Sequence, residues 1–512
     1  MSRMSQGRAR EAYGKLLAWS RELTHLGTAL SVLHWDQRTH IPAKGHANRA
    51  EQIAALARIR HQRETDPRAG EWLAAIEGTD LVAEAESVEA TNVREWRRSH
   101  DKAVKIPEDL AVALARAAAL GESAWEKAKP ANDWPAFRPH LEGLVRLRRE
   151  QAEAVGYERE AYDALLDDYE PGATAADIEP VFRELRKATV RLLDCVRGGT
   201  PPKAVVQGKD YPLADQERVC KAVAARLGYD FEAGRLDATA HPFSTRIGPG
   251  DARITTNYDP QDFTDALYSV IHEAGHAMYS QGQPEEHHGT PRGSSVSLGV
   301  HESQSRMWEN LVGRSRGFWS FFHPAFQMVF PALAGTSAED IQRWVTRVEP
   351  GFIRVRADEL TYNLHIMLRF DLELAIMRGG LAVDDLPGAW NERMREYLGL
   401  TPPDHAQGVM QDVHWSAGLF GYFPTYTLGN IFAAQFFAAA TRELGDLGQM
   451  FARGEFAPLL DWLRREIHSR GKLLRSRELV RRVTGEDPDA RHLVAHLTAR
   501  CEQAYNCRIE RI

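Results

Sequence analysis

Helical periodicity runs through almost the whole chain, and this feature restricts its possible folds most. Apolar residues recur at three- and four-residue steps over 12–33. Segments rich in strong helix formers follow at 47–63, 81–100, 107–127, 134–155 and 175–197. Proline and glycine separate these segments, and no fixed-period repeat is present. The pattern predicts a mainly α protein.

One stretch, from about residue 239 to 259, departs from this pattern. Two short β-prone runs flank the turn-forming sequence Gly248-Pro249-Gly250, which predicts a small hairpin or two edge strands. Helical periodicity resumes at about Asp262. Because no evident linker divides the chain, we expect one large folding unit with two lobes that face a cleft.

Composition excludes several classes of protein. The 64 Lys and Arg residues are outnumbered by 71 Asp and Glu residues, and this acidic balance argues against binding to nucleic acid or to an anionic membrane. The four cysteines form no CxxC pair, so neither a disulfide framework nor a cysteine metal site is expected. The polar N-terminal segment lacks the apolar core of a signal peptide, and the most apolar stretch, 418–440, is interrupted by Pro424. We expect a cytoplasmic protein.

The sequence HEAGH at 272–276 is the candidate catalytic motif. On a helix, His272 and His276 are one turn apart on the same face, where both imidazoles can bind one metal ion. Glu273 lies about 100° around the helix and can reach a water molecule bound to that ion. The motif predicts a catalytic metal centre.

A catalytic zinc needs a third protein ligand. The pattern with a glycine at 279 and a histidine at 282 is excluded, because these residues are Tyr279 and Gly282. The best candidate is Glu302, which opens a helical stretch one loop further along. The other side chains that could serve are Glu285, Glu286, Glu309, His287 and His288.

Six motifs in a fixed order give the chain a family resemblance. They are HPF at 241–243, DARIT at 251–255, HEAGH at 272–276, HESQ at 301–304, IRVRAD at 353–358 and GVMQDVHW at 408–415. In this order they resemble the motifs of the carboxypeptidase Taq family of zinc carboxypeptidases, peptidase family M32. Segments 33–39 and 163–172 resemble the family too, so the likeness spans nearly the whole chain.

The resemblance implies a fold and an activity. The expected fold is a large, helical, saddle-shaped zincin-like fold with a deep cleft and a small β-sheet patch. Residues 1–512 would form one domain, in which 1–238 cover the cleft and 239–512 hold the six motifs. The family activity is the release of single C-terminal amino acids, with broad specificity, from peptides that have a free carboxylate. The family also implies one zinc ion per chain, replaceable by cobalt, and a homodimer.

The resemblance further implies roles for individual residues. The metal ligands would be His272, His276 and Glu302, and Glu273 would be the general base toward a metal-activated water. Arg354 would bind the terminal carboxylate, with Arg253 and Arg356 as lesser candidates. By analogy with angiotensin-converting-enzyme and thimet-type zinc peptidases, His414 and one of two tyrosines, Tyr422 or Tyr426, would bind the oxyanion or the substrate backbone. The expected hydrogen-bond acceptors of the ligand imidazoles are Asp358 and Asp412, and Asp251 would anchor the strand patch.

Two alternatives remain open at this point. An oligoendopeptidase or peptidyl-dipeptidase of the same superfamily would share the metal motif but would not need the carboxylate clamp. An inactive helical scaffold would need neither the metal ligands nor His414.

Overall fold

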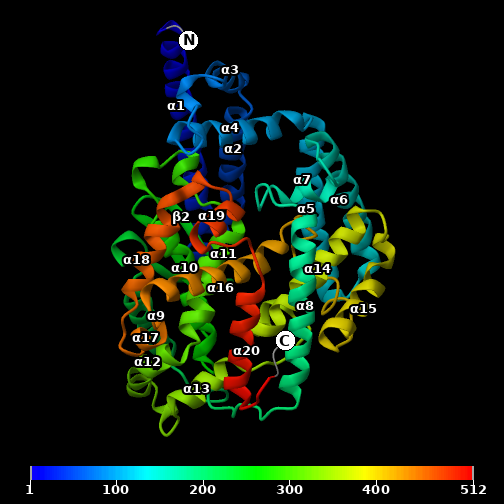
Figure 1. The fold of residues 1–512 in the computed structure, drawn as a ribbon. Helices are drawn as coiled ribbons and strands as arrows, with labels where there is room; N and C mark the ends of the chain where they lie inside the picture. The colour runs from blue at the N-terminus through cyan, green and yellow to red at the C-terminus, as the bar shows by residue number, and fades with distance from the viewer. Residues whose placement is uncertain (1–2, 510–512) are drawn as a thin grey trace.

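The computed structural model describes residues 3–509 and confirms the mainly α fold (Figure 1). The helices are α1 (Arg3–Thr39), α2 (His46–Glu64), α3 (Pro67–Ile76), α4 (Val88–Lys105), α5 (Glu108–Ala131), α6 (Trp134–Val155), α7 (Ala161–Leu166), α8 (Ala175–Arg197), α9 (Leu213–Leu227), α10 (Phe263–Gln281), α11 (Leu298–Arg306), α12 (Arg316–Val329), α13 (Ala338–Val345), α14 (Glu359–Met377), α15 (Leu386–Leu398), α16 (Pro424–Leu444), α17 (Leu447–Ala452), α18 (Ala457–Glu466), α19 (Ser476–Thr484) and α20 (Arg491–Tyr505). A π-helical segment, Met307–Gly313, directly follows α11.

Capping residues explain where the helices begin. Helices α6 and α8 have the predicted bounds, because the side chains of Asp133 and Thr174 accept hydrogen bonds from backbone N–H groups in the first turn. The predicted start at residue 81 is wrong, since α4 begins only after Ser87. The Ser87 hydroxyl accepts from the N–H of Ala90 at 3.1 Å and fixes that start.

The β-prone stretch forms a three-stranded sheet in the order β1-β3-β2. The predicted hairpin is present: β2 (Ser244–Gly248) and β3 (Asp251–Thr256) pair antiparallel. The third strand, β1 (Leu236–Ala238), pairs parallel with β3 and was not predicted. Three residues are too few for an alternating pattern, and this strand exists only through its pairing with β3.

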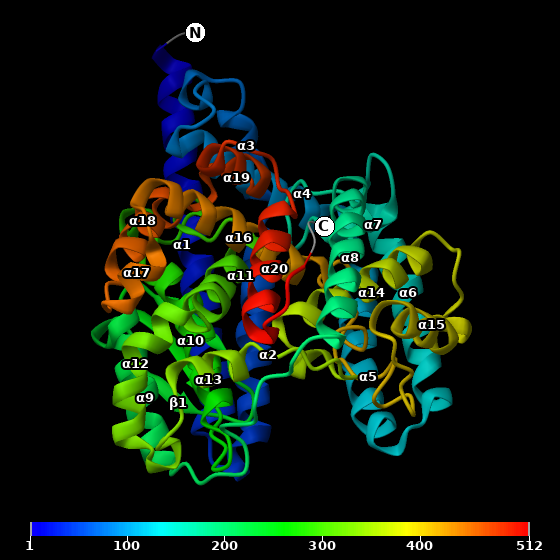
Figure 2. The ribbon, with the colours of Figure 1, turned by 60° about the horizontal axis from the view of Figure 1, so that its bottom comes forward.

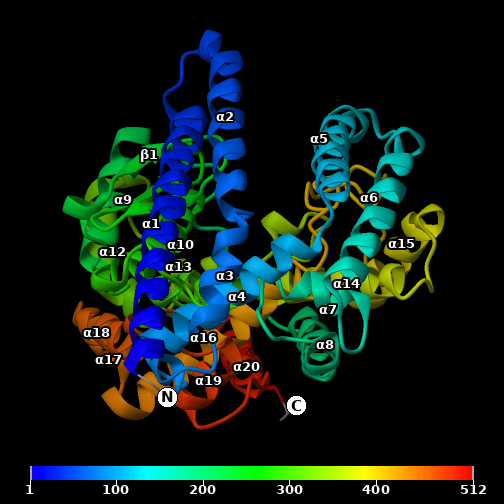
Figure 3. The ribbon, with the colours of Figure 1, turned by 90° about the horizontal axis from the view of Figure 1, so that it is seen from above.

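The helices fall into two groups joined by a shared base. Seen from above, α5, α6 and α15 lie apart from α1, α2, α9 and α10 (Figure 3). The view turned by 60° shows the same separation between α5, α6 and α15 on one side and α9, α10 and α12 on the other (Figure 2). The base consists of α10, α11 and α16, in which α10 contacts α11 and α16 packs along α11. It brings together segments that are far apart in the sequence.

The apolar faces of the helices pack against one another and form internal cores. The main core runs from Ala128 in α5 to Ile509, and a smaller one joins α1, α3 and α4 around Leu16, Leu73 and Trp96. Within residues 3–509, no helix has both the length and the apolar character that a bilayer crossing requires.

A cavity of about 1390 Å³ opens beside the base. Its wall includes side chains of α10, α11, α14, α16 and α20, together with the segment 345–359. A cavity of this size can hold several residues of a peptide.

Candidate metal centre

Helix α10 fixes the position of two histidines. Asp262 caps the helix by accepting a hydrogen bond from the N–H of Thr264 at 2.8 Å. His272 and His276 then follow one turn apart, with their ring centroids 4.9 Å from each other. The HExxH spacing therefore places both imidazoles on one helix face, as the sequence predicts.

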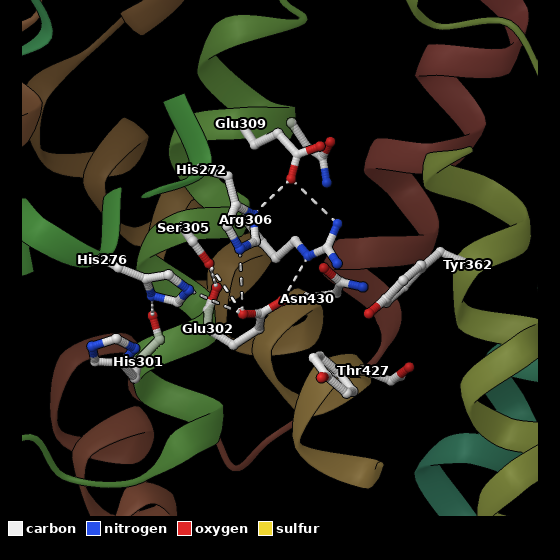
Figure 4. Close-up of polar contacts among 12 residues, drawn as sticks. His272, His276, His301, Glu302, Ser305, Arg306, Glu309, Tyr362, Thr427 and Asn430 are labelled. Atoms are coloured by element: carbon white, nitrogen blue, oxygen red, sulfur yellow. Dashed lines mark hydrogen bonds and ion pairs between the residues drawn. The ribbon is translucent and has the colours of Figure 1, made fainter. Parts of the chain in front are cut away.

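Helix α11 carries Glu302 toward these histidines. A Cβ at Gly275 would lie 2.7 Å from the Cα of Ser305, so only glycine allows the α10 and α11 backbones to approach this closely. The Glu302 Oε2 atom lies 3.4 Å from His276 Nε2 and 3.8 Å from His272 Nε2. Figure 4 shows the carboxylate and both rings turned toward one another.

Each of these two imidazoles contacts an oxygen acceptor through its Nδ1 atom. His272 Nδ1 lies 2.9 Å from Glu309 Oε2, and His276 Nδ1 lies 3.0 Å from the carbonyl oxygen of His301. Because both partners are acceptors, each Nδ1 carries a proton and each Nε2 is left free to bind a metal.

Buried arginines balance the carboxylates beside this cluster. Arg306 binds Glu302 Oε1 at 2.8 Å and Glu309 Oε2 at 3.3 Å, and Arg314 binds Glu309 Oε1 at 3.1 Å. The opposite face of Arg306 stacks on Tyr362 at 4.2 Å (Figure 4). Burial raises the pKa of Glu302, but Arg306 and the two neighbouring histidines together outweigh burial and hold this pKa well below its usual range. Glu302 is therefore ionised, as a metal ligand must be.

The donor set fits a divalent metal ion. One nitrogen each from His272 and His276 and one oxygen from Glu302 lie within 4.8 Å of one another. Two imidazoles and one carboxylate form a common ligand set for catalytic zinc, and they also suit cobalt. These three residues are the predicted ligands, and their role stays a prediction.

Glu273 lies on the cavity wall next to this cluster. Its side chain is buried, with 7% of the residue exposed. Burial raises the pKa of its carboxyl above the ordinary value, and the neighbouring imidazoles oppose this rise. A raised pKa suits a group that has to accept a proton and then release it.

Arg354 also lies on the cavity wall, held there by the motif 408–415 and by Tyr362 of α14. Its Nε and Nη2 atoms bind Asp412 at 2.9 Å and 2.8 Å, and its Nη1 donates to the Tyr362 hydroxyl at 3.1 Å. Its backbone N–H donates to the Gln411 amide oxygen at 2.9 Å. Arg369 binds the other Asp412 oxygen at 2.7 Å, so two arginines share one carboxylate and leave a net positive charge. This charge suits the binding of an anion.

The two lesser arginine candidates differ in their surroundings. Arg253 binds both oxygens of Asp251 at 2.8 Å and stacks on Trp35 at 4.2 Å, which ties α1 to the sheet. Among the described residues that line the cavity, Arg356 is present and Arg253 is not. The pairing with Asp251 does not favour Arg253 as a substrate ligand, and that role stays a prediction. The interpretation of Asp251 as an anchor agrees with its position.

The predicted oxyanion residues lie together, and Tyr426 is the one on the cavity wall. His414 Nε2 lies 3.2 Å from the Tyr426 hydroxyl, and the ring centroids of His414 and Tyr422 are 5.2 Å apart. Burial and the charge of Arg354 lower the pKa of His414 to about 4, so the imidazole is neutral near pH 7.

The prediction that Asp358 and Asp412 orient the ligand imidazoles is wrong. Asp358 caps α14 and accepts from the N–H groups of Leu360 and Thr361, both at 2.9 Å. Asp412 is needed between two buried arginines, which would otherwise lack a counter-charge. The carboxylate that meets a ligand imidazole belongs to Glu309 instead.

From the sequence, Glu309 is expected only as an alternative metal ligand, and no role is expected for Arg306, Tyr362 or Glu170. Two of these four residues left a local signal. Arg306 and Glu309 lie four and seven residues after Glu302, a spacing that puts all three on one helical face. Tyr362 and Glu170 left no such local signal. Glu170, in the segment 163–172, is fully buried and accepts a hydrogen bond from the N–H of Gly299 at the start of α11.

Comparison with protein families gives one match over nearly the whole chain. The model of the carboxypeptidase Taq (M32) metallopeptidases matches residues 15–501. The match covers all six motifs and the cavity wall.

Individual relatives agree over their full lengths. The chain is 53% identical to thermostable carboxypeptidase 1 of Thermus thermophilus, with 96% of this chain and 99% of the relative covered. It is 37% identical to carboxypeptidase 1 of Bacillus subtilis, with 95% and 97% covered. The crystal structure of the M32 carboxypeptidase of Deinococcus radiodurans superposes with a TM-score of 0.94 at 40% identity, covering 97% of this chain and 100% of that one.

Proposed function

The chain belongs to the carboxypeptidase Taq (M32) family and is a metal-dependent carboxypeptidase, and from this premise we propose that it uses one zinc ion to release single amino acids from peptide C-termini. The observation that carries the proposal is the convergence of His272, His276 and Glu302 beside a cavity whose wall holds His272, Glu302 and Arg354. Cobalt is an alternative ion, because the same donors accept it.

The proposed metal ligands bind through His272 Nε2, His276 Nε2 and a Glu302 oxygen. The chemistry that a divalent ion supplies when bound here is Lewis-acid polarisation of the scissile carbonyl and of the attacking water. Glu309 and the His301 carbonyl hold the two rings in the tautomer that leaves Nε2 available.

Glu273 is the proposed general base. Its carboxylate takes a proton from the attacking water and then gives it to the nitrogen of the leaving amino acid. Its position on the cavity wall, one residue after His272, supports this role. Burial supports it as well, since the raised pKa brings the carboxyl closer to the working pH.

Arg354 is the proposed recognition group for the free terminal carboxylate. Asp412 and Tyr362 fix its guanidinium, which limits the entropy lost when a substrate binds. A guanidinium has five N–H donors, and these partners leave some of them for a substrate. A single fixed clamp near the metal cluster limits cleavage to the last peptide bond.

Tyr426 is the proposed oxyanion donor, with His414 as its hydrogen-bond partner. Of His414, Tyr422 and Tyr426, Tyr426 is the one that lines the cavity. His414 Nε2 is 3.2 Å from the Tyr426 hydroxyl oxygen. Its hydroxyl proton can be directed at the carbonyl oxygen as negative charge develops there.

Broad side-chain specificity is the proposed substrate range. Acidic and basic side chains both line the cavity, among them Asp265, Glu349, Arg347 and Arg356. This mixture favours no single charge in a substrate side chain. The oligoendopeptidase, peptidyl-dipeptidase and scaffold interpretations are not favoured, since the relatives compared are carboxypeptidases.

The setting of the enzyme is also proposed. The four cysteines are free, which supports a reducing cytoplasm. The main core runs from α5 to Ile509, and the contact of Arg253 with Trp35 ties α1 to the sheet. Both support one folding unit for 1–512, with 1–238 covering the cleft and 239–512 catalytic. Family membership is the support for a homodimer.

A time course by mass spectrometry tests the proposed function. One mixed-sequence peptide is offered with a free and with an amidated C-terminus, before and after chelation and after re-addition of zinc or cobalt. We expect stepwise loss of single residues from the free peptide alone, stopped by the chelator and restored by the metal. Internal cleavage of both peptides would contradict the proposal.

A further inference from the structure

The buried Glu373 belongs to no part of the mechanism described above. It lies on α14 with no exposed surface and outside the described cavity wall. Its carboxylate accepts three hydrogen bonds: from Trp415 Nε1 at 2.8 Å, from the Gly421 N–H at 3.0 Å and from the Tyr162 hydroxyl at 2.7 Å. A carboxylate is costly to bury, so three donors on one such group indicate a requirement for it.

Two of these donors lie at the ends of the loop 414–422. Trp415 directly follows His414, and Gly421 directly precedes Tyr422. One carboxylate therefore closes the loop by holding both of its ends. His414 and Tyr422 consequently meet with their ring centroids 5.2 Å apart.

The position of the His414 ring depends on this loop. Its Nδ1 is buried and has no hydrogen-bond partner among the described residues, so no polar contact fixes that side of the ring. The ring instead packs on Phe423, with centroids 4.5 Å apart, and on Tyr422. Its Nε2 reaches the Tyr426 hydroxyl. A shift at either end of the loop would move His414 relative to Tyr426.

We propose that Glu373 is a positioning residue that holds His414 and the loop 414–422 in place beside Tyr426. The inference rests on the proposed oxyanion role of Tyr426 and its partner His414. Glu373 does not reach the substrate, and it acts through the two loop contacts. Its loss should lower the rate of the chemical step and leave metal and ground-state substrate binding nearly unchanged.

Glu373→Gln is the test variant. A glutamine has the same size, but its NH₂ group must face either the Trp415 N–H or the Gly421 N–H, so one loop contact is lost. The matched control is Tyr162→Phe, which removes the third donor from the same carboxylate and leaves both loop contacts intact. Trp415→Phe removes one loop contact while retaining Glu373, and it decides the question if Glu373→Gln does not fold.

The measurements are kcat, KM and zinc content on a free-carboxylate peptide. For Glu373→Gln we expect kcat to fall by about 10-fold to 100-fold, with KM and zinc content within about threefold of wild type. Trp415→Phe should lower kcat in the same way, and Tyr162→Phe should stay within about threefold of wild type. Equal losses in Glu373→Gln and Tyr162→Phe, or an unchanged kcat in Glu373→Gln, would overturn the proposal.

A double-mutant cycle with His414→Ala separates positioning from general stability. If Glu373 acts through His414, Glu373→Gln should cause no further loss in the His414→Ala background. If the losses caused by Glu373→Gln and His414→Ala multiply in the double variant, the positioning role of Glu373 is overturned and the proposed function is not. A wild-type kcat in His414→Ala would contradict the role of His414 and this inference with it. Failure of the wild-type enzyme to release C-terminal residues would instead contradict the proposed function.

Discussion

Removal of the Arg354 side chain tests the carboxylate clamp. The guanidinium is nearly buried, with 7% of its side chain exposed, so water screens its contacts only weakly. Its Nε and Nη2 atoms bind Asp412 and its Nη1 binds Tyr362, and the remaining N–H groups can bind a substrate carboxylate. A hydrogen bond between charged groups contributes about 1.5–3 kcal/mol. Two such bonds, reduced by partial replacement with water, give a loss of about 3 kcal/mol, or about 100-fold in kcat/KM.

Arg354→Ala should retain its fold and its metal. Asp412 still binds Arg369, at 2.7 Å and 2.6 Å, so no buried carboxylate is left without a counter-charge. The assay compares kcat/KM on a free peptide and on its amide. The matched control is Arg253→Ala, which also removes an arginine paired with an aspartate but at a site away from the cavity wall.

We expect a selective loss in Arg354→Ala. Activity on the free peptide should fall about 100-fold, which removes most of the preference for free over amidated peptide. Arg253→Ala should keep that preference. Equal losses on both peptides, or an equal loss of preference in both variants, would refute the assignment of the clamp.

Three further predictions concern the carboxylates around the site. Glu273→Gln should keep the metal and lower kcat by about 100-fold to 10,000-fold. Metal content and rate measured on one sample check this, and retained turnover would exclude Glu273 as the general base. Glu309→Gln should weaken zinc binding by about 10-fold or more in a competition titration with a chromophoric chelator, since it removes the charge that faces His272; an unchanged affinity would contradict this. Burial raises the pKa of Glu170 from 4.5 to about 7, so the folded state retains a proton that the unfolded state releases. The free energy of unfolding should therefore fall by about 3 kcal/mol between pH 4.5 and pH 7, and it should level off above pH 7. Glu170→Gln cannot titrate and should lose this component in denaturant unfolding at pH 5 and pH 8; identical pH dependence in both proteins would contradict it.

Local sequence signals account for most of the fold. Helices α6 and α8 have the predicted bounds because their caps, Asp133 and Thr174, are short-range features. The turn at 248–250 likewise identifies the hairpin of β2 and β3. Strand β1 depends on a distant partner, and no local pattern could identify it. The predicted start at residue 81 is wrong for α4, although its cap, Ser87, is a residue type that signals a helix start.

The contacts of the site also differ in whether local sequence spacing or the packing of distant segments determines them. His272 and His276 share one helix turn, so their proximity follows from sequence spacing alone. Glu309 lies two helical turns beyond Glu302, and its contact with His272 was within reach of the same reasoning. Asp412, by contrast, binds Arg354 and Arg369 through contacts between distant segments. Such a pairing depends on the packing of α14 and of the segment 345–359 against the loop that carries Asp412, and one sequence does not reveal it.

The identity of the metal ligands is the central claim, and an anomalous difference map of zinc-loaded crystals, recorded at the zinc absorption edge, tests it most directly. The account predicts one peak per chain, bonded to His272 Nε2, His276 Nε2 and a Glu302 oxygen at about 2.0–2.2 Å. In the electron density of the same crystals, Glu309 should remain on His272 Nδ1. A peak bonded to Glu309 in place of Glu302, or no peak at the two histidines, would contradict the account.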